Sequence, residues 1–432
     1  MDNKLNVVFK RAGWIADTNI YEVNIRQFSD EGTFNAFASH IPRLKDMGVE
    51  ILWFMPIHPI GKINRKGTLG SYYSISNFKA VNSEFGTAAD FKRLVSLAHK
   101  SGMKVIMDWV ANHAAWDNVW TADHPGYFVQ DDKGNFKPPY DWTDVIQIDH
   151  TNPDQQDAMI EAMKYWVTDF DIDGFRADLA HLTPLDFWIK ARTAIEPLKN
   201  GLFWLAESEE IDYHKVFDAS FTWEWMHATE HFFKESNNIS SLYTVLAKYN
   251  SSFPEEAYRM YFTSNHDENS WNGTEYEKYG AMAKALAVFS CTWNGIPMIY
   301  SGQEMPNLKR LKFFEKDAIE WTADYQLHEF YKTLLNLRKT NTALRAADTA
   351  VSTFHIMTDT GKNIMAYLRK NENDEVLVFL NLSNSTTGFI IQDQLVKGTY
   401  INVFDKSENI LAADAFIKMQ PWDYLIFEKK GE

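Results

Sequence analysis

The chain has 432 residues, of which 45% are hydrophobic, so it is long enough to bury a large core and to carry an appended domain. Its net charge of −15 argues against nucleic acid as a partner, because phosphates would be repelled. The single cysteine, Cys291, excludes an internal disulfide framework and a cysteine-based zinc site, and we expect it to be a buried core residue. An acidic enzyme acting on a neutral substrate fits these features.

The N-terminal residues 1–17 contain no long apolar segment of the kind that signal peptides carry. No run in the chain approaches the roughly 18 apolar residues that a membrane span needs, so a membrane is not an expected partner. The expected location is cytoplasmic, unless a leader has been removed, in which case the protein would be secreted or periplasmic. We expect a monomer.

Short apolar strands alternate with helical stretches over most of the chain. Residues 19–28 are predicted to form a strand, and residues 36–48 an amphipathic helix that ends at Gly48, a natural C-cap. The same order returns with a strand at 49–57 and a helix at 88–102. The predicted strands are residues 19–28, 49–57, 103–110, 172–179, 201–207, 216–221, 258–265 and 295–300. Such alternation predicts an α/β fold, a parallel sheet closed into a (β/α)8 TIM barrel.

Two segments depart from this alternation. The stretch that follows the third strand is rich in Trp, Asp, Pro and Gly and is too long for an ordinary connection, so it indicates a small inserted subdomain. The C-terminal part alternates apolar and polar residues in short strands, which is typical of an antiparallel β-sandwich domain. The predicted division is residues 1–113 and 151–348 for the barrel, 114–150 for the inserted subdomain and 349–432 for the β-sandwich.

Charged and polar residues fall at the C-terminal ends of the predicted barrel strands, where parallel barrels place their reactive groups. They are Asp108, Asn112 and His113 after strand three, Arg176 and Asp178 after strand four, Glu207 after strand five, and His266 and Asp267 after strand seven. Carboxylates gathered at one rim repel each other and cost stability, which favours a functional reading over a structural one.

Arg176 and Asp178 lie two residues apart on one strand, so their side chains point to the same face. Alone, the pair would be a structural ion pair at a strand end. Within the converging set, we expect Arg176 to orient Asp178 and to hold it ionised. A carboxylate kept deprotonated beside another kept protonated is the arrangement that glycoside hydrolysis needs.

Six segments occur in the order typical of one enzyme family. They are "FKAVNSEFGT" at 78–87, "DWVANH" at 108–113, "GFRADLAH" at 174–181, "ESEE" at 207–210, "TSNHDEN" at 263–269 and "GIPMIYSGQE" at 295–304. With these segments the chain resembles the α-amylase superfamily of retaining glycoside hydrolases over nearly its whole length. The resemblance implies the same barrel, inserted subdomain and C-terminal β-sandwich.

The resemblance also implies roles for individual residues. Asp178 corresponds to the nucleophile, Glu207 to the general acid and base, and Asp267 to the residue that stabilises the transition state. Arg176 would orient Asp178, and Asp108 would support the site. The residues that would bind the sugar are His113, His266 and Tyr73, with the neighbouring Tyr72 as the alternative stacking residue.

Two positions depart from the family pattern. Many α-amylases carry a Lys-His pair at the third and fourth positions after the nucleophile, where this chain has His181 and Leu182, so the leaving-group side is built differently. A calcium ligand of the family is matched by Asn112, but Gln147 stands near the expected aspartate. A neutral amide is a poor partner for a hard cation, so we do not expect calcium there. The chemistry requires no cofactor.

The resulting hypothesis is a retaining hydrolase that cleaves α-1,4-glucosidic bonds in starch-like polysaccharides or maltooligosaccharides through a covalent glycosyl-enzyme. The alternative is a glucanotransferase, or an exo-acting α-glucosidase or maltodextrin hydrolase, that uses the same site. A non-catalytic carbohydrate-binding or transport-accessory relative is disfavoured, because such proteins usually lose a catalytic carboxylate and Asp178, Glu207 and Asp267 are all present.

Overall fold

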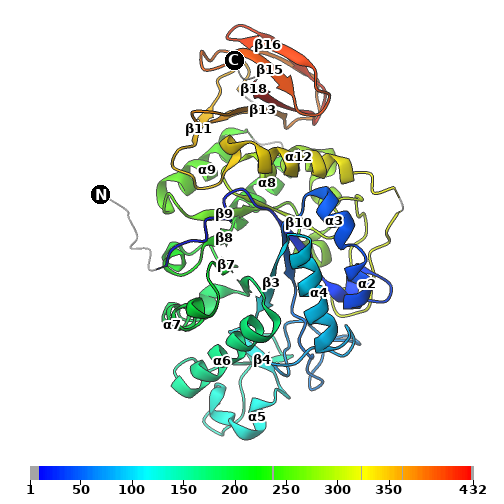
Figure 1. The fold of residues 1–432 in the computed structure, drawn as a ribbon, viewed down its shortest axis with the longest axis vertical. Helices are drawn as coiled ribbons and strands as arrows, with labels where there is room; N and C mark the ends of the chain where they lie inside the picture. The colour runs from blue at the N-terminus through cyan, green and yellow to red at the C-terminus, as the bar shows by residue number, and fades with distance from the viewer. Residues whose placement is uncertain (1–8, 236–237, 323, 362, 430–432) are drawn as a thin grey trace.

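The computed structural model describes residues 9–235, 238–322, 324–361 and 363–429. Eight parallel strands close into a barrel in the order β1-β10-β9-β8-β7-β6-β3-β2, as predicted (Figure 1). Their bounds are β1 Ile20–Val23, β2 Ile51–Phe54, β3 Lys104–Trp109, β6 Gly174–Ala177, β7 Phe203–Ala206, β8 Ala219–Phe221, β9 Tyr258–Tyr261 and β10 Ile296–Tyr300. A barrel strand therefore lies within each of the predicted ranges.

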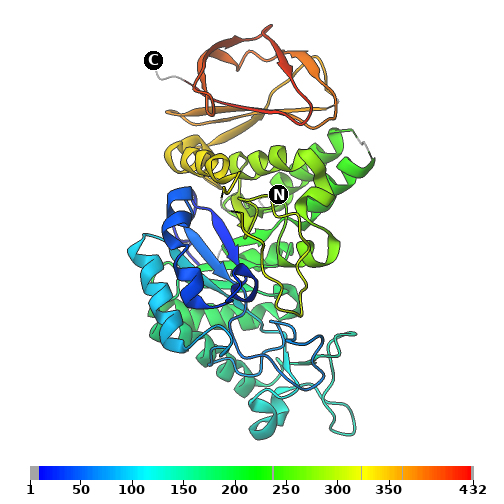
Figure 2. The same ribbon diagram turned by 90° about the vertical axis from the view of Figure 1, so that its right-hand side faces the viewer.

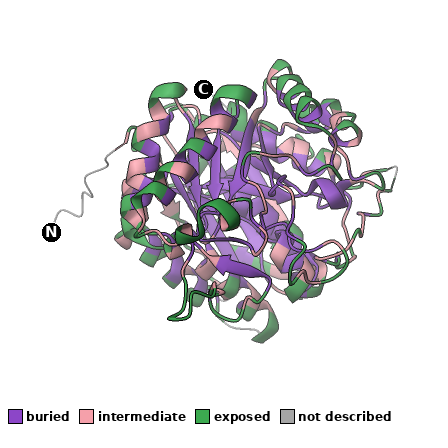
Figure 3. Ribbon diagram, turned by 90° about the horizontal axis from the view of Figure 1, so that it is seen from below, coloured by how far each residue is buried: buried purple, intermediate pink, exposed green. Residues whose placement is uncertain are grey.

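Helices surround the barrel and present their polar faces outward, which Figure 3 shows as exposed outer turns around a buried centre. They are α1 Ile25–Phe28, α2 Phe34–Ala38, α3 Ile41–Met47, α4 Ala88–Lys100, α6 Pro153–Phe170, α7 Leu185–Ile195, α8 Trp223–Glu235, α9 Ser240–Ser252, α10 Glu275–Tyr279, α11 Ala283–Thr292 and α12 His328–Thr340. Shorter helical turns are Ala180–Leu182, Glu196–Leu198, Ile211–Lys215, Gly280–Met282 and Thr342–Leu344, with a π-helical turn at Glu268–Asn272.

Two predictions near the N-terminus are wrong in part. The strand expected over 19–28 ends at Val23, because Asn24 O accepts hydrogen bonds from Gln27 N and Phe28 N and so begins the helical turn α1. Every residue of that turn is buried, so its sequence shows no helical period. The helix expected over 36–48 is split into α2 and α3, with proline in the first turn of α3, where its missing N–H costs nothing. The C-cap at Gly48 is confirmed by a left-handed φ of 97°.

Alternate strand residues fill the inside of the barrel and the layer between the strands and the helices. Ile51 and Trp53 on β2 belong to the interior cluster, whereas Leu52 and Phe54 belong to the large outer core. The interior cluster also contains Ile20, Ile106, Phe203, Leu205, Phe221, Met260, Ile296 and Met298. This close filling fixes the strand register, and with it the side chains at the strand ends.

The segment between β3 and α6 lies at one end of the molecule, opposite the C-terminal domain (Figures 1 and 2). It carries the short helix α5 Trp120–Asp123, the turn Pro125–Tyr127 and a two-stranded sheet of β4 His113–Ala115 with β5 Val145–Gln147. The pairing of β4 with β5 returns the chain to the barrel rim, so His113 stays beside the strand ends.

The C-terminal domain is an antiparallel β-sandwich, as predicted. Its six-stranded sheet runs β11-β12-β13-β18-β15-β16 and packs on the pair β14-β17 through a common core in which Phe379 contacts Phe389. The strands are β11 Ser352–His355, β12 Ile364–Lys370, β13 Glu375–Asn381, β14 Thr387–Ile390, β15 Lys397–Asn402, β16 Glu408–Ala412, β17 Phe416–Met419 and β18 Tyr424–Lys429. Sequence analysis missed β16 and β17.

The C-terminal domain rests on α8, α9 and α12 (Figure 1) and is fixed by buried hydrogen bonds. Arg369 on β12 donates to Ala343 O, Arg345 O and Thr353 Oγ1. The nearby Cys291 is buried, as predicted, and burial raises the pKa of its thiol to about 12. Within the described ranges, no helix combines the length and the apolar character that a membrane crossing requires.

Gly174, at the start of β6, allows β6 and β7 to approach each other closely. Its φ is 155°, and an added Cβ would lie 1.9 Å from Phe203 O. Gly174→Ala is expected to lower the free energy of unfolding by about 3 kcal/mol or more, because backbone cannot move aside as a flexible side chain can. Urea unfolding measures the loss.

Gly126→Ala is the matched control, since its added Cβ would meet nothing closer than 3.8 Å. An unfolding midpoint for Gly174→Ala equal to that of the wild type would contradict this account of the β6–β7 contact.

Candidate active site

The seven residues that sequence analysis named as site residues come together at the C-terminal ends of the barrel strands. A cavity of about 250 Å³ opens there, and its lining includes Tyr73, His113, Asp178, Glu207 and Asp267. Arg176 and His266 are buried and contact these residues from within the barrel. The strand ends thus bring together groups that are up to about 190 residues apart in sequence, such as Tyr73 and His266.

Arg176 is the centre of the site's charge network. Its guanidinium is fully buried, and Nη1 lies 2.8 Å from Asp108 Oδ1 and 3.0 Å from Asp178 Oδ1, while Nη2 lies 2.7 Å from Glu207 Oε2. Asp108 and Arg176 are direct partners in the pairing of β3 with β6. Trp53 stacks beside the guanidinium at 4.9 Å from its ring centre. One buried cation therefore serves three carboxylates, two of which, Asp178 and Glu207, also line the cavity.

Sharing this cation changes the ionisation of Asp178. Burial raises the pKa of Asp178 well above its usual range, and the attraction of Arg176 opposes this only in part, because Glu207 and Asp108 repel the same charge. Burial likewise raises the pKa of Asp108. The guanidinium of Arg176 lowers the pKa of Asp178, in the expected direction, but burial and the charges of Glu207 and Asp108 raise it by more.

The residue after Asp178 links the carboxyl groups of Asp178 and Glu207. Leu179 adopts a left-handed backbone with φ 39°, a strained conformation for a side chain of this size. Its N–H donates to Glu207 Oε2 at 2.9 Å, the same oxygen that faces Arg176. Glu207 Oε2 is therefore held, and Oε1 remains for the cavity. In Asp178, Oδ1 contacts Arg176 in the same way.

Tyr73 is the tyrosine that faces the cavity. Its hydroxyl donates to Asp108 Oδ2 at 3.1 Å and lies 2.7 Å from His266 Nε2, and its ring stacks on His266 with centroids 5.5 Å apart. The alternative, Tyr72, is buried under the guanidinium of Arg26 and does not line the cavity. The Tyr73 ring is thus fixed by Asp108 and His266 at the edge of the cavity that it lines.

Sequence analysis missed Glu22, a buried carboxylate in the middle of β1. Its Oε1 lies 2.5 Å from His266 Nδ1, and the His266 Nε2 lies 3.3 Å from Asp267 Oδ2. Although burial alone would lower it, the pKa of His266 is raised well above its usual value by Asp267 and Glu22. The raised pKa favours the imidazolium form, whose Nδ1–H faces Glu22 and whose Nε2–H lies between the Tyr73 hydroxyl and Asp267.

The other histidine is uncharged. His113 is buried on β4, its ring meets Trp142 edge-on at 5.6 Å, and burial lowers its pKa to about 4. A neutral imidazole has one donor and one acceptor nitrogen, which suits a sugar hydroxyl.

An aromatic wall completes one side of the cavity. It consists of Trp271, Phe313 and Phe314. Trp271 is 52% exposed, and its ring lies tilted by 36° against Phe313, with ring centres 5.4 Å apart. Burial raises the pKa of Asp267, but the His266 imidazolium and a hydrogen bond from Trp271 outweigh this and lower it. The sequence left the role of Trp271 open, and the phenylalanines lie in a loop that has no periodic pattern.

The positions that depart from the family pattern, His181 and Gln147, add no charged side chain to the cavity. His181 is exposed and does not line the cavity. Asn112 and Gln147 lie on either side of His113, since His113 pairs with Gln147, and they offer only neutral amide oxygens. Two amide oxygens without a carboxylate are a weaker set of ligands for a hard divalent cation than one that includes Asp or Glu.

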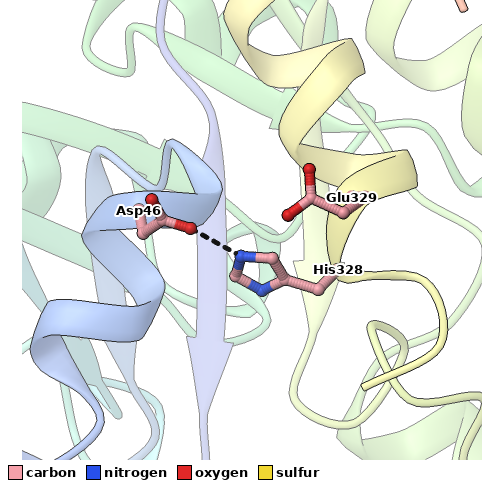
Figure 4. Close-up of side chains that lie close together, drawn as sticks. All are labelled: Asp46, His328 and Glu329. Atoms are coloured by element: carbon pink, nitrogen blue, oxygen red, sulfur yellow. Dashed lines mark hydrogen bonds and ion pairs between the residues drawn. The ribbon is translucent and has the colours of Figure 1, made fainter. Parts of the chain in front are cut away.

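Among the described residues, the one group of three His, Cys, Asp or Glu side chains that could converge on a metal ion is Asp46, His328 and Glu329 (Figure 4). The ammonium group of Lys332 already supplies a positive charge to this cluster, because its Nζ lies 2.9 Å from both Asp46 oxygens. The cluster joins α3 to α12 and is remote from the cavity.

Comparison with known proteins gives consistent results. The family model described as "Alpha amylase, catalytic domain" matches residues 11–147 and 131–317, and "Maltogenic Amylase, C-terminal domain" matches residues 354–426. The alpha-amylase MalA of Haloarcula japonica is 27% identical over 390 residues, which are 87% of this chain and 56% of that protein. This chain thus spans little more than half the length of that relative.

Solved structures agree over almost the whole chain. A noncanonic maltogenic alpha-amylase, AmyB from Thermotoga neapolitana, superposes with a TM-score of 0.89 at 28% identity and covers 96% of this chain and 99% of its own. An alpha-amylase from Lactobacillus plantarum gives a TM-score of 0.86 at 27% identity, with coverage of 96% and 99%.

The contact between Glu22 and His266 predicts a pH effect. In Glu22→Gln, the imidazolium loses one of its carboxylates, so the pKa of His266 falls and the alkaline limb of kcat/KM moves to lower pH. The pKa of His266 in the folded protein is raised above its unfolded value of about 6.5. His266 therefore adds to the free energy of unfolding by its full amount below about pH 6.5, and this contribution is lost as the pH rises through the pKa of the folded protein. In the variant, the folded-state pKa is lower, so this contribution is smaller and its loss is complete at lower pH.

The measurements are a pH–rate profile and urea unfolding at several pH values. Glu275→Gln is the matched control, because Glu275 is also buried but contacts Thr263 instead of His266. An alkaline limb that stays in place in Glu22→Gln would show that Glu22 does not charge His266.

Proposed function

We propose that this chain, which belongs to the α-amylase family of glycoside hydrolases, cleaves α-1,4-glucosidic bonds in starch-like polysaccharides or maltooligosaccharides with retention of configuration. The observation that carries the proposal is the sharing of one buried guanidinium by Asp178 and Glu207 at a cavity with aromatic walls. The printed names of the relatives, alpha-amylase and maltogenic alpha-amylase, support α-glucans as substrates.

In the first step, Asp178 attacks the anomeric carbon through Oδ2, because Oδ1 is held by Arg176. The bond between that carbon and the glycosidic oxygen breaks, and Glu207 gives its proton to the leaving oxygen. The product is a covalent ester between the sugar and Asp178. In the second step, Glu207 removes a proton from water, and the resulting attack on the anomeric carbon releases Asp178.

The remaining residues hold the sugar in place. Tyr73 stacks on its apolar face, and the neutral His113 reaches its hydroxyls. The charged His266, which sequence analysis expected to bind the sugar, lies behind the cavity and positions Tyr73 and Asp267 instead. Asp267, whose pKa is lowered by His266, grips hydroxyls as the ring flattens toward the transition state.

The proton needed for the first step comes from the crowded carboxyl cluster. Burial and mutual repulsion raise the pKa of Asp178, so this cluster holds a proton more readily than an exposed carboxyl does. The reactive form has this proton on Oε1 of Glu207 and leaves Asp178 ionised against Arg176. Carboxyl groups thereby supply the nucleophile, the acid and the base, so the proposed chemistry needs no cofactor.

An ion pair at the cavity rim bears on product length. Lys66, in the loop after β2, contacts Asp144 of the inserted segment at 2.8 Å, and both line the cavity. Figure 2 shows this loop beside the inserted segment. The side chain of Asp144 is only 8% exposed, so the pair is partly shielded from water. We propose that this bridge limits how many sugar units extend past the rim and so favours short products.

Asp178→Asn is expected to lower kcat on maltoheptaose by about 10³-fold or more, because an amide cannot form the ester. Glu207→Gln should lower it by about 10²- to 10⁴-fold, but much less on α-maltosyl fluoride, since fluoride leaves without a proton. Proton NMR of the first products should show the α-anomer.

Glu209→Gln is the control for Glu207→Gln, because Glu209 instead bonds Tyr249 Oη and the backbone N–H of Glu224. A β-anomer formed first would overturn retention, and unchanged maltoheptaose with the wild-type protein would overturn the α-1,4-glucan assignment. Products longer than the substrate would favour transfer over hydrolysis.

Lys66→Met tests the rim bridge. Without the ammonium group, the ion pair between the loop and Asp144 is lost, and early products from soluble starch should become longer. Lys62→Met is the control on the same loop, since Lys62 does not line the cavity. Chromatography of the early products measures the change; identical profiles for both variants and the wild type would exclude a role of the bridge in product length.

A further inference from the structure

A second cavity lies between α8 of the barrel and the C-terminal domain. Its volume is about 360 Å³, and it shares no residue with the cavity that holds Asp178. One wall is aromatic, with Phe233 of α8 and Trp422 of the turn between β17 and β18 at a centroid distance of 5.6 Å. The opposite lining is polar and comes from Asn363, Ser383 and Asn384.

Among the residues that the structure describes, those that line this cavity carry no charge. Its residues are Phe, Leu, Trp, Asn and Ser, although 23% of the whole chain is Asp, Glu, Lys or Arg. A charged ligand would find no partner there, and a purely apolar ligand would leave the amides without water. Flat aromatic surface beside amide and hydroxyl groups suits a neutral ligand that has an apolar face and a rim of hydroxyls.

Trp422 is held at this place against its backbone preference. Its φ is 59°, in the left-handed region, which bulky residues adopt only where the surroundings impose it. The Trp422 N–H donates to Ser383 O at 3.0 Å, and Asn381 Nδ2 donates to both Ser385 O and Gln420 O. These bonds tie the turn to the loop that supplies the polar lining, so ring and amides are fixed together.

Hydrogen-bonding groups remain available at the cavity. The side-chain amide of Asn363 bonds no other residue that the structure describes, and Asn384 uses only Oδ1, which accepts from Ser385 Oγ at 3.2 Å. Donors of the two amides are thus left for a ligand next to the Trp422 ring. A volume above about 300 Å³ is in the range of small-molecule sites.

We infer that this cavity is a second carbohydrate-binding site, which binds a short segment of an α-glucan by stacking on Trp422 and hydrogen bonding to Asn363 and Asn384. The choice of an α-glucan rests on the proposed function. Such a site holds a polymer near the enzyme while another segment of it occupies the cavity at Asp178, and it adds nothing to the cleavage of short substrates.

The test is electrophoresis of the full chain in native gels that contain soluble starch, all in the Glu207→Gln background so that the starch stays intact. Trp422→Ala and Asn384→Ala are each expected to weaken retardation by starch by about tenfold, the usual effect of losing a central contact. Without that background substitution, both should raise KM for soluble starch and leave kcat/KM for maltotriose unchanged.

Phe416→Ala is the matched control, because Phe416 is an exposed aromatic residue of the same domain (67% exposed) outside the cavity. An α-1,4-glucan site is supported if Trp422→Ala and Asn384→Ala migrate faster than the chain with the unsubstituted cavity in starch gels but migrate equally with it in dextran gels. Equal retardation of Trp422→Ala, Asn384→Ala and the wild type would overturn it. If Trp422→Ala does not fold, the polar variants Asn384→Ala and Asn363→Ala decide. Failure of the proposed function would appear separately, as intact maltoheptaose with the wild-type enzyme.

Discussion

The buried guanidinium of Arg176 is the interaction on which the candidate site depends. A carboxylate removed from water is costly unless it is paired, and here Asp108, Asp178 and Glu207 share one cation. The second cation, the imidazolium of His266, serves Glu22 and Asp267 in the same way. Acidic groups still outnumber these cations, so the site disfavours anionic ligands and retains protons. Both consequences suit a neutral substrate whose leaving group must be protonated.

The barrel makes this sharing possible through strand register. In the pairing of β3 with β6, Asp108 lies opposite Arg176, and in the pairing of β6 with β7, Ala177 lies opposite Ala206, so that Glu207 follows at the rim. A shift of one residue would turn Arg176 out of the barrel and leave the carboxylates unpaired. Gly174, which permits the close approach of β6 and β7, therefore supports the chemistry as well as the fold.

Sequence reasoning succeeded where a residue carries its own signal. The barrel strands are buried apolar runs, and Asp178, Glu207 and Asp267 lie in recognisable segments at the ends of such runs. It failed where the signal comes from a partner that is distant in sequence. Glu22 looks like an ordinary polar residue in a strand, and only the fold brings it to His266, 244 residues away. Strand β16 was missed because its residues are mostly exposed, which leaves little apolar alternation to detect.

The arrangement around Glu207 explains how a cluster of similar carboxyl groups can divide its tasks. Oε2 of Glu207 faces Arg176 and accepts the Leu179 N–H, and both contacts favour negative charge on that oxygen. A proton on Glu207 is therefore placed on Oε1, toward the cavity. Asp178 has only the contact of its Oδ1 with the guanidinium, so its other oxygen is the one left to attack. The strained backbone of Leu179 is what aims its N–H at Glu207, and it thereby assigns acid and nucleophile to neighbouring side chains.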